Sequence, residues 1–244
     1  FVEMSMDSKK TEVQYEKYLN QNWPKSGRHI LAQFDNEKIL VYQAFNNTIA
    51  DYAIKHQRFR GCPSYSETRM TWVKTNFLWM MYRSGWAAKK DQQRILGIWL
   101  KREAFDKILE DACHVKFSAE MKCSKSDYER SVSRAKQEKF FIRLQWDPDH
   151  NPNGSKNAFR RAIQLGCKNM SSLSSGDDII EIIDMTPFVK EQKENSSSDR
   201  YEFLITPLEK VYSPQDQKIA DHILLDMYEE ELFTTNSERI DLYS

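Results

Sequence analysis

The chain has 244 residues, which is enough for one large domain. Its 36 Lys and Arg residues balance 36 Asp and Glu residues, so the net charge gives no overall attraction to nucleic acid or to a membrane. The sequence holds no run of 18 apolar residues, which predicts no membrane-spanning helix and no membrane partner.

The four cysteines are far apart in the sequence. They are Cys62, Cys113, Cys123 and Cys167. They show no CxxC pair and no Cys/His spacing typical of zinc ligands, so we predict no metal site. Reduced thiols of this kind are typical of a cytoplasmic or nuclear protein.

The chain divides into three parts by composition. Residues 1–26 are polar and are predicted to form an N-terminal arm, either mobile or holding a short helix. Residues 27–212 are predicted to form the core domain, and residues 213–244 a C-terminal helix and tail, with the helix over 214–232. Strands and helices alternate irregularly, with several antiparallel neighbours. This order predicts the α+β class, in a single compact domain with a mixed sheet.

The first predicted elements are two strands. The apolar runs 29–34 and 38–45 flank three polar residues, a pattern that predicts a β-hairpin. The second run carries Tyr42 and Gln43 shortly before a helix predicted over 49–56. One interpretation is that a nucleotide binds at this strand end, because helix N-termini attract phosphate. The other is an ordinary strand with a tyrosine at its rim.

The stretch 69–86 is predicted to form one helix, because it lacks proline and its single glycine, Gly85, comes at its end. Apolar side chains cover most of its circumference, which indicates a helix inside the domain. The polar residues Lys74, Asn76, Tyr82 and Arg83 lie inside this stretch. The two cations either reach past aromatic side chains to ordinary carboxylates or line a polar cavity that receives an anionic ligand.

A strand predicted over 140–146 runs into a turn-rich loop over 147–154. The junction gathers Trp146, Asp147 and His150 at a strand end, where functional groups often lie. Asp147 either takes part in chemistry or caps a turn. His150 is either a general base or an ordinary loop histidine.

The next predicted strand, 160–166, carries Arg160 and Gln164 on one face and Arg161 on the other. An arginine and a glutamine on one face suit an anion and a hydroxyl; the alternative is a strand edge with solvent-facing arginines. No GxGxxG, GxxxxGK[ST], HExxH or GxSxG motif occurs, which argues against the common designs that carry those motifs. The mixture of cations with flat rings such as Trp146 favours a nucleotide or nucleic-acid ligand.

Seven motifs between about residues 28 and 212 occur in an order that resembles the family known as domain of unknown function 4291. They are Val41-Tyr-Gln-Ala44, Met70-Thr-Trp-Val-Lys74, Phe77-Leu-Trp-Met-Met-Tyr-Arg-Ser-Gly-Trp86, Gln145-Trp-Asp-Pro148, Arg161-Ala-Ile-Gln164 with Gly166, Asp184-Met-Thr-Pro187 and Pro207-Leu-Glu-Lys-Val-Tyr212. The long tryptophan-rich motif makes this resemblance specific, but the family name implies no function.

The order of the elements also resembles that of ADP-ribosyltransferases that act on nucleic acid. This resemblance implies an ADP-ribosyltransferase-like fold, NAD as substrate, and RNA or DNA as acceptor through a nucleobase or an end. It implies contact with NAD for Tyr42 and Gln43, contact with phosphate or nicotinamide for Lys74, Tyr82 and Arg83, and contact with the ribose for Gln164 or Glu181. Fold-level likeness of this kind sets only an expectation.

Two other functions use the same residues. One is a non-catalytic nucleic-acid-binding module, in which the cations and rings hold a strand. The other is a different nucleotide-handling enzyme, such as a hydrolase that uses Asp147, Asp149 or His150. In every case Trp146 and Arg161 are further candidate ligand contacts.

Overall fold

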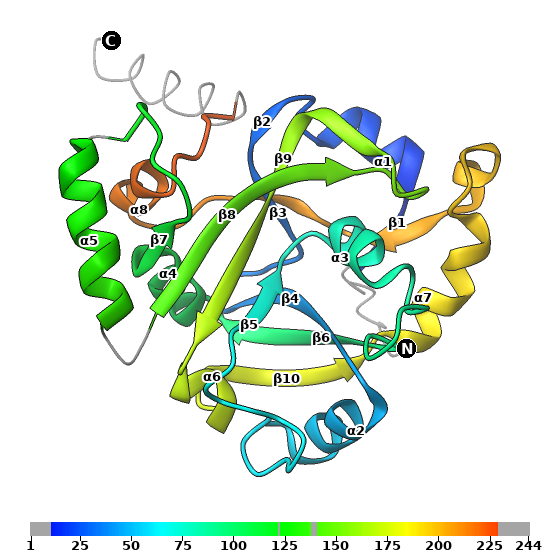
Figure 1. The fold of residues 1–244 in the computed structure, drawn as a ribbon. Coiled ribbons are helices and arrows are strands. Elements are labelled where there is room, and N and C mark those ends of the chain that lie inside the picture. Colours follow the sequence, from blue (N-terminus) through cyan, green and yellow to red (C-terminus); the bar gives the residue numbers. More distant parts are fainter. Residues whose placement is uncertain (1–10, 122, 138–140, 229–244) are drawn as a thin grey trace, which may run out of the picture.

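The computed structural model describes residues 11–121, 123–137 and 141–228, in which strands and helices alternate irregularly (Figure 1). The strands are β1 (Glu12–Gln14), β2 (Gly27–Arg28), β3 (Ile30–Ala32), β4 (Lys38–Phe45), β5 (Thr71–Lys74), β6 (Arg94–Lys101), β7 (Ala112–His114), β8 (Phe141–His150), β9 (Lys156–Lys168), β10 (Ile179–Asp184), β11 (Ile205–Pro207) and β12 (Lys210–Tyr212). The helices are α1 (Tyr15–Asn22), α2 (Asn47–His56), α3 (Phe77–Ser84), α4 (Arg102–Glu110), α5 (Lys125–Gln137), α6 (Ser171–Ser175), α7 (Thr186–Gln192) and α8 (Gln217–His222), with short 3-10 turns η1 (Lys193–Asn195) and η2 (Ser198–Phe203). The predicted α+β class is confirmed.

Strand β4 is central because both of its faces are buried. Ile39 and Val41 enter one apolar cluster, and Leu40 and Tyr42 enter another. The first cluster also holds side chains of α2 and α4, and the second holds side chains of α3 and α7. A strand buried on both sides has a nearly continuous apolar sequence rather than an alternating one, as this strand does.

Within the described residues, eight strands form one mixed sheet in the order β10-β6-β4-β5-β9-β8-β7, with β2 beside β9. Strand β4 pairs with β6 along its whole length, but its pairing with β5 rests on Tyr42 and Lys74 alone in this part of the chain. Beyond that junction β8 and β9 run across the direction of β6 and β10 (Figure 1). The sheet therefore separates into two halves at the boundary between β4 and β5.

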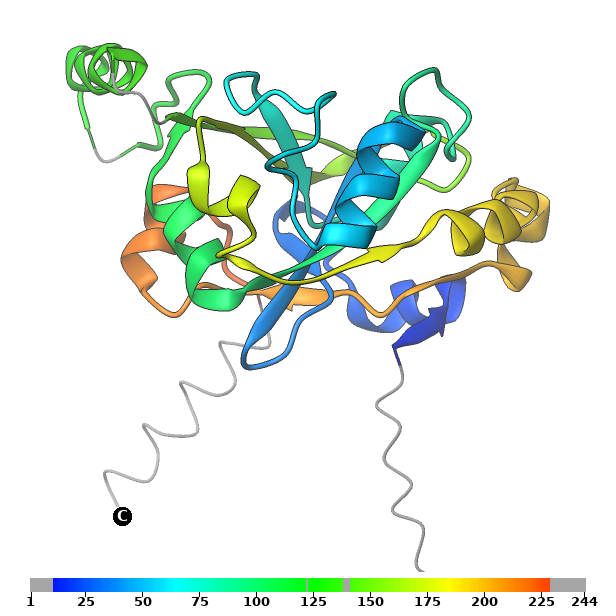
Figure 2. The same ribbon diagram turned by 90° about the horizontal axis from the view of Figure 1, so that it is seen from below.

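The helices cover the two half-sheets unevenly. Helix α2 lies against β10 and β6, α4 against β6 and β4, and α3 against β4, β5 and β8. In both ribbon views α5 lies at one end of the molecule and α7 at the opposite end (Figures 1 and 2). Helix α3 is thus the helix that spans the junction of the halves.

The prediction of one helix over 69–86 is wrong. Thr71–Lys74 forms β5, which pairs with β9, and α3 begins only at Phe77. The side chain of Asn76 caps α3 by accepting a backbone N–H of its first turn, and Gly85 ends the helix with φ +60°. Sheet pairing has thus overridden a helical spacing of apolar residues.

The description of residues 1–26 as an arm needs correction where the structure describes them. Strand β1 pairs with β11, and α1 follows directly. Tyr15 and Trp23 are buried in the second apolar cluster, so residues 11–26 belong to the packed domain. Residues 1–10 and 229–244 lie outside the described residues, and the C-terminal helix is described only as the short α8.

The predicted hairpin over residues 29–45 is only partly formed. A turn joins β3 to β4 through a bridge between Phe34 and Ile39, but β3 pairs with β12. None of the four cysteines forms a disulfide. In the described ranges we find no helix with the length and apolar character needed to cross a membrane, and no His, Cys, Asp and Glu cluster arranged to hold a metal ion.

Candidate functional site

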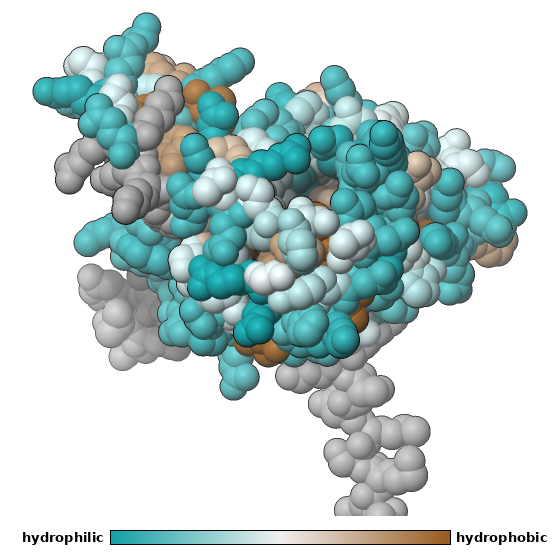
Figure 3. Space-filling view, turned by 60° about the horizontal axis from the view of Figure 1, so that its bottom comes forward, coloured by the Kyte–Doolittle hydropathy of each residue, from teal (hydrophilic) through white to brown (hydrophobic). Residues whose placement is uncertain are grey.

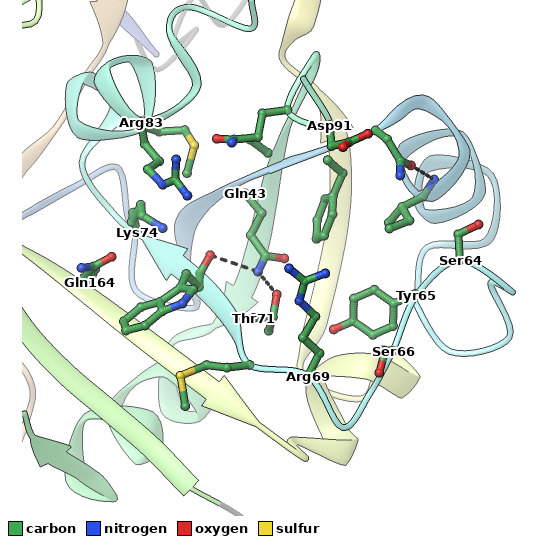
Figure 4. A pocket seen from close by; sticks show the side chains of 18 of the residues that line it. Gln43, Ser64, Tyr65, Ser66, Arg69, Thr71, Lys74, Arg83, Asp91 and Gln164 are labelled. Atoms are coloured by element: carbon green, nitrogen blue, oxygen red, sulfur yellow. Dashed lines mark hydrogen bonds between the residues drawn. The ribbon is translucent and has the colours of Figure 1, made fainter. Parts of the chain in front are cut away.

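A cavity of about 710 Å³ opens where the two half-sheets separate. Its walls come from the ends of β4 and β5, from β9, from α3 and from the loops that precede β5 and β6. In the view of Figure 4, Lys74, Arg83 and Gln164 lie on one side of Gln43, and Arg69 and Tyr65 lie on the other. The weak pairing of β4 with β5 leaves the room that these side chains line.

Lys74 is the buried cation of this cavity. Its side chain comes from β5 at the register of Gln164 and is only 4% exposed. Its Nζ lies 4.7 Å from the ring centre of Trp79 and 6.0 Å from that of Trp72. No carboxylate of the described residues forms an ion pair with it. Contact with two indoles offsets only part of the cost of burying the charge.

The pKa of Lys74 reflects this environment. Burial, and after it the nearby Arg83, lowers it to about 7, while Asp147 acts in the opposite direction. Near neutral pH the amine is therefore charged in only part of the molecules. An anion bound beside it would favour the ammonium form.

Two arginines lie at the rim of the cavity. Arg69 and Arg83 are both exposed, and neither guanidinium forms an ion pair or a hydrogen bond within the described part of the chain. Asp91 is the one carboxylate among the lining residues. The interpretation in which Lys74 and Arg83 reach ordinary carboxylates therefore fails, and the cavity carries an excess of positive charge.

Two of the amide side chains in the lining come from strands, Gln43 from β4 and Gln164 from β9. Gln43 is 2% exposed, and its Nε2 donates to Thr71 Oγ1 at 2.8 Å and to the Trp72 carbonyl at 3.2 Å. Because Nε2 donates both of these hydrogen bonds, the orientation of the amide is fixed. The other amide atom, the acceptor Oε1, has no hydrogen-bond partner among the described residues. Gln164 lies in β9 between Lys74 and Gln145 in neighbouring strands.

Aromatic rings complete the walls. Tyr65, Trp72 and Trp79 all line the cavity. Trp72 lies so close to β9 that a Cβ on Gly166 would come within 3.0 Å of its ring, so glycine is needed there for this packing. Trp79 Nε1 is buried and has no partner in the described part. The face shown in Figure 3 is mainly hydrophilic, with apolar atoms confined to small areas.

The structure thus brings part of the predicted site together. Gln43, Lys74, Arg83 and Gln164 line one cavity. The other predicted residues lie outside its lining: Tyr42, Tyr82, Trp146, Asp147, His150, Arg161 and Glu181.

Tyr82 and His150 form a pair beside the cavity. Their rings stack at 3.6 Å, and Trp79 contacts both rings edge-on. His150 is only 2% exposed, and burial lowers its pKa. Neither ring nitrogen has a hydrogen-bond partner in the described ranges, so His150 lies in the protein interior rather than in a loop exposed to a substrate.

Asp147 on β8 is close enough to Lys74 for their charges to interact. Its Oδ1 accepts a hydrogen bond from Gln145 Nε2 at 2.9 Å, and burial raises its pKa although Lys74 and Arg161 favour the charged form. It stabilises the charge of Lys74 at a distance. It does not reach the space that a ligand would occupy.

Three residues that the sequence suggested as NAD contacts lie outside the lining of the cavity, which corrects their assignment to the binding site. Tyr42 is fully buried against Phe77, under α3. Trp146 packs on the first apolar cluster and donates its Nε1 hydrogen to the Ile223 carbonyl at 2.9 Å. Arg161 lines a separate, smaller groove together with Trp146. Side-chain alternation along β8 and β9 points these two residues away from the face of Gln164.

Several other residues that line the cavity are not indicated by any pattern in the sequence. Arg69 precedes β5, Tyr65 and Ser66 belong to the loop after α2, and Asp91 lies in the loop before β6. Loops placed on a rigid sheet often carry binding groups. No periodic pattern marks Asp91.

A family model described as Domain of unknown function (DUF4291) matches residues 29–212. All cavity residues named above lie within that match. No curated protein matches the sequence. The match covers most of the chain, and the chain belongs to this family, DUF4291.

Proposed function

We propose that the protein binds NAD in the cavity and transfers ADP-ribose from it to a nucleic acid. The observation that carries the proposal is the set of cations Arg69, Lys74 and Arg83, which lack ion-pair partners in the described ranges and share one cavity with the indole rings of Trp72 and Trp79. The two negative charges of a pyrophosphate would balance such a set. A cavity of about 710 Å³ is also within the range of small-molecule sites.

The positions of the residues suggest a role for each. The exposed guanidiniums of Arg69 and Arg83 suit the pyrophosphate, and the rings of Trp72 and Trp79 offer flat faces for a nicotinamide or an adenine. The unpartnered Oε1 of Gln43 can accept a hydrogen bond from an amide N–H of the ligand.

In the proposed reaction the bond between nicotinamide nitrogen and ribose C1′ breaks, and nicotinamide leaves with the bonding electrons. A nucleophilic nitrogen or oxygen of the nucleic acid forms the new bond to C1′ and loses its proton to solvent. The intervening oxocarbenium character needs electron-rich neighbours. Such neighbours in the lining include the carboxylate of Asp91 and the amide oxygens of Gln43 and Gln164.

Release of nicotinamide, measured with and without RNA or DNA, tests the proposal. We expect turnover by the wild type and at least about a tenfold loss in Arg83→Ala and Gln164→Ala, since each removes an interaction with a charged or polar part of the substrate. Arg161→Ala is the matched control in the absence of acceptor, because Arg161 is also an exposed arginine but lies outside the cavity. Absence of turnover by the wild type with either acceptor would contradict ADP-ribosyl transfer.

A non-catalytic nucleic-acid-binding site is the second candidate. It is favoured by the scarcity of carboxylates in the lining, where Asp91 stands alone, and by the exposure of both arginines. Binding of this kind weakens steeply as salt rises and is indifferent to NAD. Competition by NAD for a labelled oligonucleotide separates the two candidates.

A further inference from the structure

The amine of Lys74 has an unusual combination of surroundings. It is 4% exposed yet lines a cavity large enough for a ligand, and no described acid holds it in the charged form through an ion pair. The titratable groups around it are Arg83 on α3, Asp147 on β8 and Cys167 on β9, with Arg69 and Asp91 elsewhere in the lining. Most surface lysines have carboxylates or water around them instead.

These surroundings favour a neutral amine. Burial raises the pKa of the Cys167 thiol to about 12, so this neighbour carries no charge at neutral pH. The Lys74 pKa of about 7 leaves roughly half of the amine unprotonated at pH 7. For an ordinary lysine the unprotonated fraction at that pH is about 0.04%. An unprotonated amine is a nucleophile, and a desolvated one is a stronger nucleophile.

We propose that Lys74 forms an imine with the C1 aldehyde of a phosphorylated sugar whose phosphate lies against Arg69 and Arg83. The two exposed arginines lie at the rim, and the buried amine lies deeper, so the cavity can hold the phosphate outside and the carbonyl inside. The inference rests on the anion-binding part of the proposed function and not on ADP-ribosyl transfer.

Imine formation needs only the lysine amine and the aldehyde, and it releases one water molecule. The nitrogen lone pair of Lys74 forms a bond to C1, and the carbonyl oxygen becomes a hydroxyl. That oxygen then leaves as water, taking the two amine hydrogens, and a carbon–nitrogen double bond remains. Added cyanoborohydride reduces the imine to a stable secondary amine, which records where it formed.

The test uses the full chain with ribose 5-phosphate and cyanoborohydride, followed by mass mapping of the lysines. We expect one adduct, on Lys74, formed at pH 7 at least about ten times faster than on any exposed lysine, because the larger neutral fraction outweighs the lower intrinsic reactivity of a weaker base. Ribose without phosphate is expected to react more slowly, and inorganic phosphate is expected to compete. The rate at Lys74 should level off above about pH 7, unlike the rates at exposed lysines.

Two variants control the result. Lys74→Met removes the buried amine without adding a permanent charge, and Lys90→Met makes the same change at an exposed position. Loss of the rapid adduct in the first variant only, with melting temperatures of both variants no lower than that of the wild type, supports the proposal. Equal labelling of Lys74 and exposed lysines, or equal rates with ribose and ribose 5-phosphate, overturns it. A Lys74 adduct without NAD turnover would reject the proposed transferase activity but keep this inference.

Discussion

At the scale of single residues, Lys74 couples the stability of the protein to pH. Its pKa is lowered to about 7 in the folded protein and returns to its ordinary value on unfolding. Between these values the unfolded chain binds one more proton than the folded chain. The free energy of unfolding therefore gains a contribution that rises with pH, by at most about 1.4 kcal/mol per pH unit.

We expect Lys74→Met to be more stable than the wild type, with a margin that is largest at and below pH 7 and shrinks toward pH 10. Urea unfolding at pH 6.5 and pH 9 measures this margin. Lys90→Met is the control, because Lys90 is exposed and its replacement should change stability by less than about 0.5 kcal/mol at both pH values. A margin for Lys74→Met that does not depend on pH would contradict the assignment.

A second residue-scale expectation concerns the buried ion pair of Arg160 and Asp149. These side chains are 3% and 1% exposed and meet at 2.6 Å, and Arg160 also donates to the Pro24 carbonyl. We expect Arg160→Met to lose about 3–5 kcal/mol of unfolding free energy, because it leaves the Asp149 carboxylate buried without its cation. Arg161→Met, one position away and exposed, should lose less than about 0.5 kcal/mol in the same urea titration. Similar losses in the two variants would be inconsistent with a tight pair.

At the scale of elements, α3 is held at its N-terminus by two acceptors. Asn76 Oδ1 accepts the Trp79 N–H at 2.7 Å, and the fully buried Glu209 accepts the Phe77 N–H at 2.6 Å. Burial raises the pKa of Glu209 well above its ordinary value despite that hydrogen bond. The position of α3 in turn sets the positions of Trp79 and Arg83 in the cavity.

This arrangement gives opposite expectations for two substitutions. Because the folded protein keeps the Glu209 proton after the unfolded chain has lost it, stability falls as pH rises above about 4.3. Glu209→Gln removes this loss. Its free energy of unfolding should therefore increase relative to that of the wild type as the pH rises from 4 to 7. Asn76→Ala should instead lose about 1 kcal/mol at every pH, as expected for a missing N-cap. Parallel pH profiles of unfolding for wild type and Glu209→Gln would show that Glu209 is ionised in the fold.

The limits of prediction from sequence are clearest in the stretch 69–86. The aromatic content of this stretch made it possible to predict that it lies inside the domain and contributes many residues to the cavity. Its division into β5 and α3 was not predictable in this way. Val73 and Phe77 fall at helical spacing, but the strand is fixed by pairing with β9, which is distant in sequence. Asn76, a good N-cap residue, was the available local signal for a helix start.

The cavity could be predicted only in part for a similar reason. Charge and burial pointed to Lys74 and Arg83, and strand alternation pointed to Gln164. The sequence also favoured Trp146, which the strand register places on the opposite face of the sheet from Gln164, because nothing local showed which face of β8 would border the cavity. Arg69 and Asp91 reach the cavity from loops, whose paths depend on the whole fold.

At the scale of the whole molecule, the division of the sheet creates the binding space. The single pair between Tyr42 and Lys74 joins half-sheets that run in different directions, and the cavity lies where they separate. Balanced overall charge gives no long-range attraction to anions, so binding depends on the local cations. We therefore expect salt to weaken the proposed binding of NAD mainly through the exposed arginines.

The melting temperature of the protein, measured as NAD is raised to millimolar concentrations, tests the central claim most directly. A ligand that binds only the folded state must raise the melting temperature by mass action. We expect a concentration-dependent rise for the wild type and for Arg161→Ala, and a smaller rise for Arg83→Ala. No rise for the wild type, or an equal rise for Arg83→Ala, would contradict the assignment of this cavity to NAD.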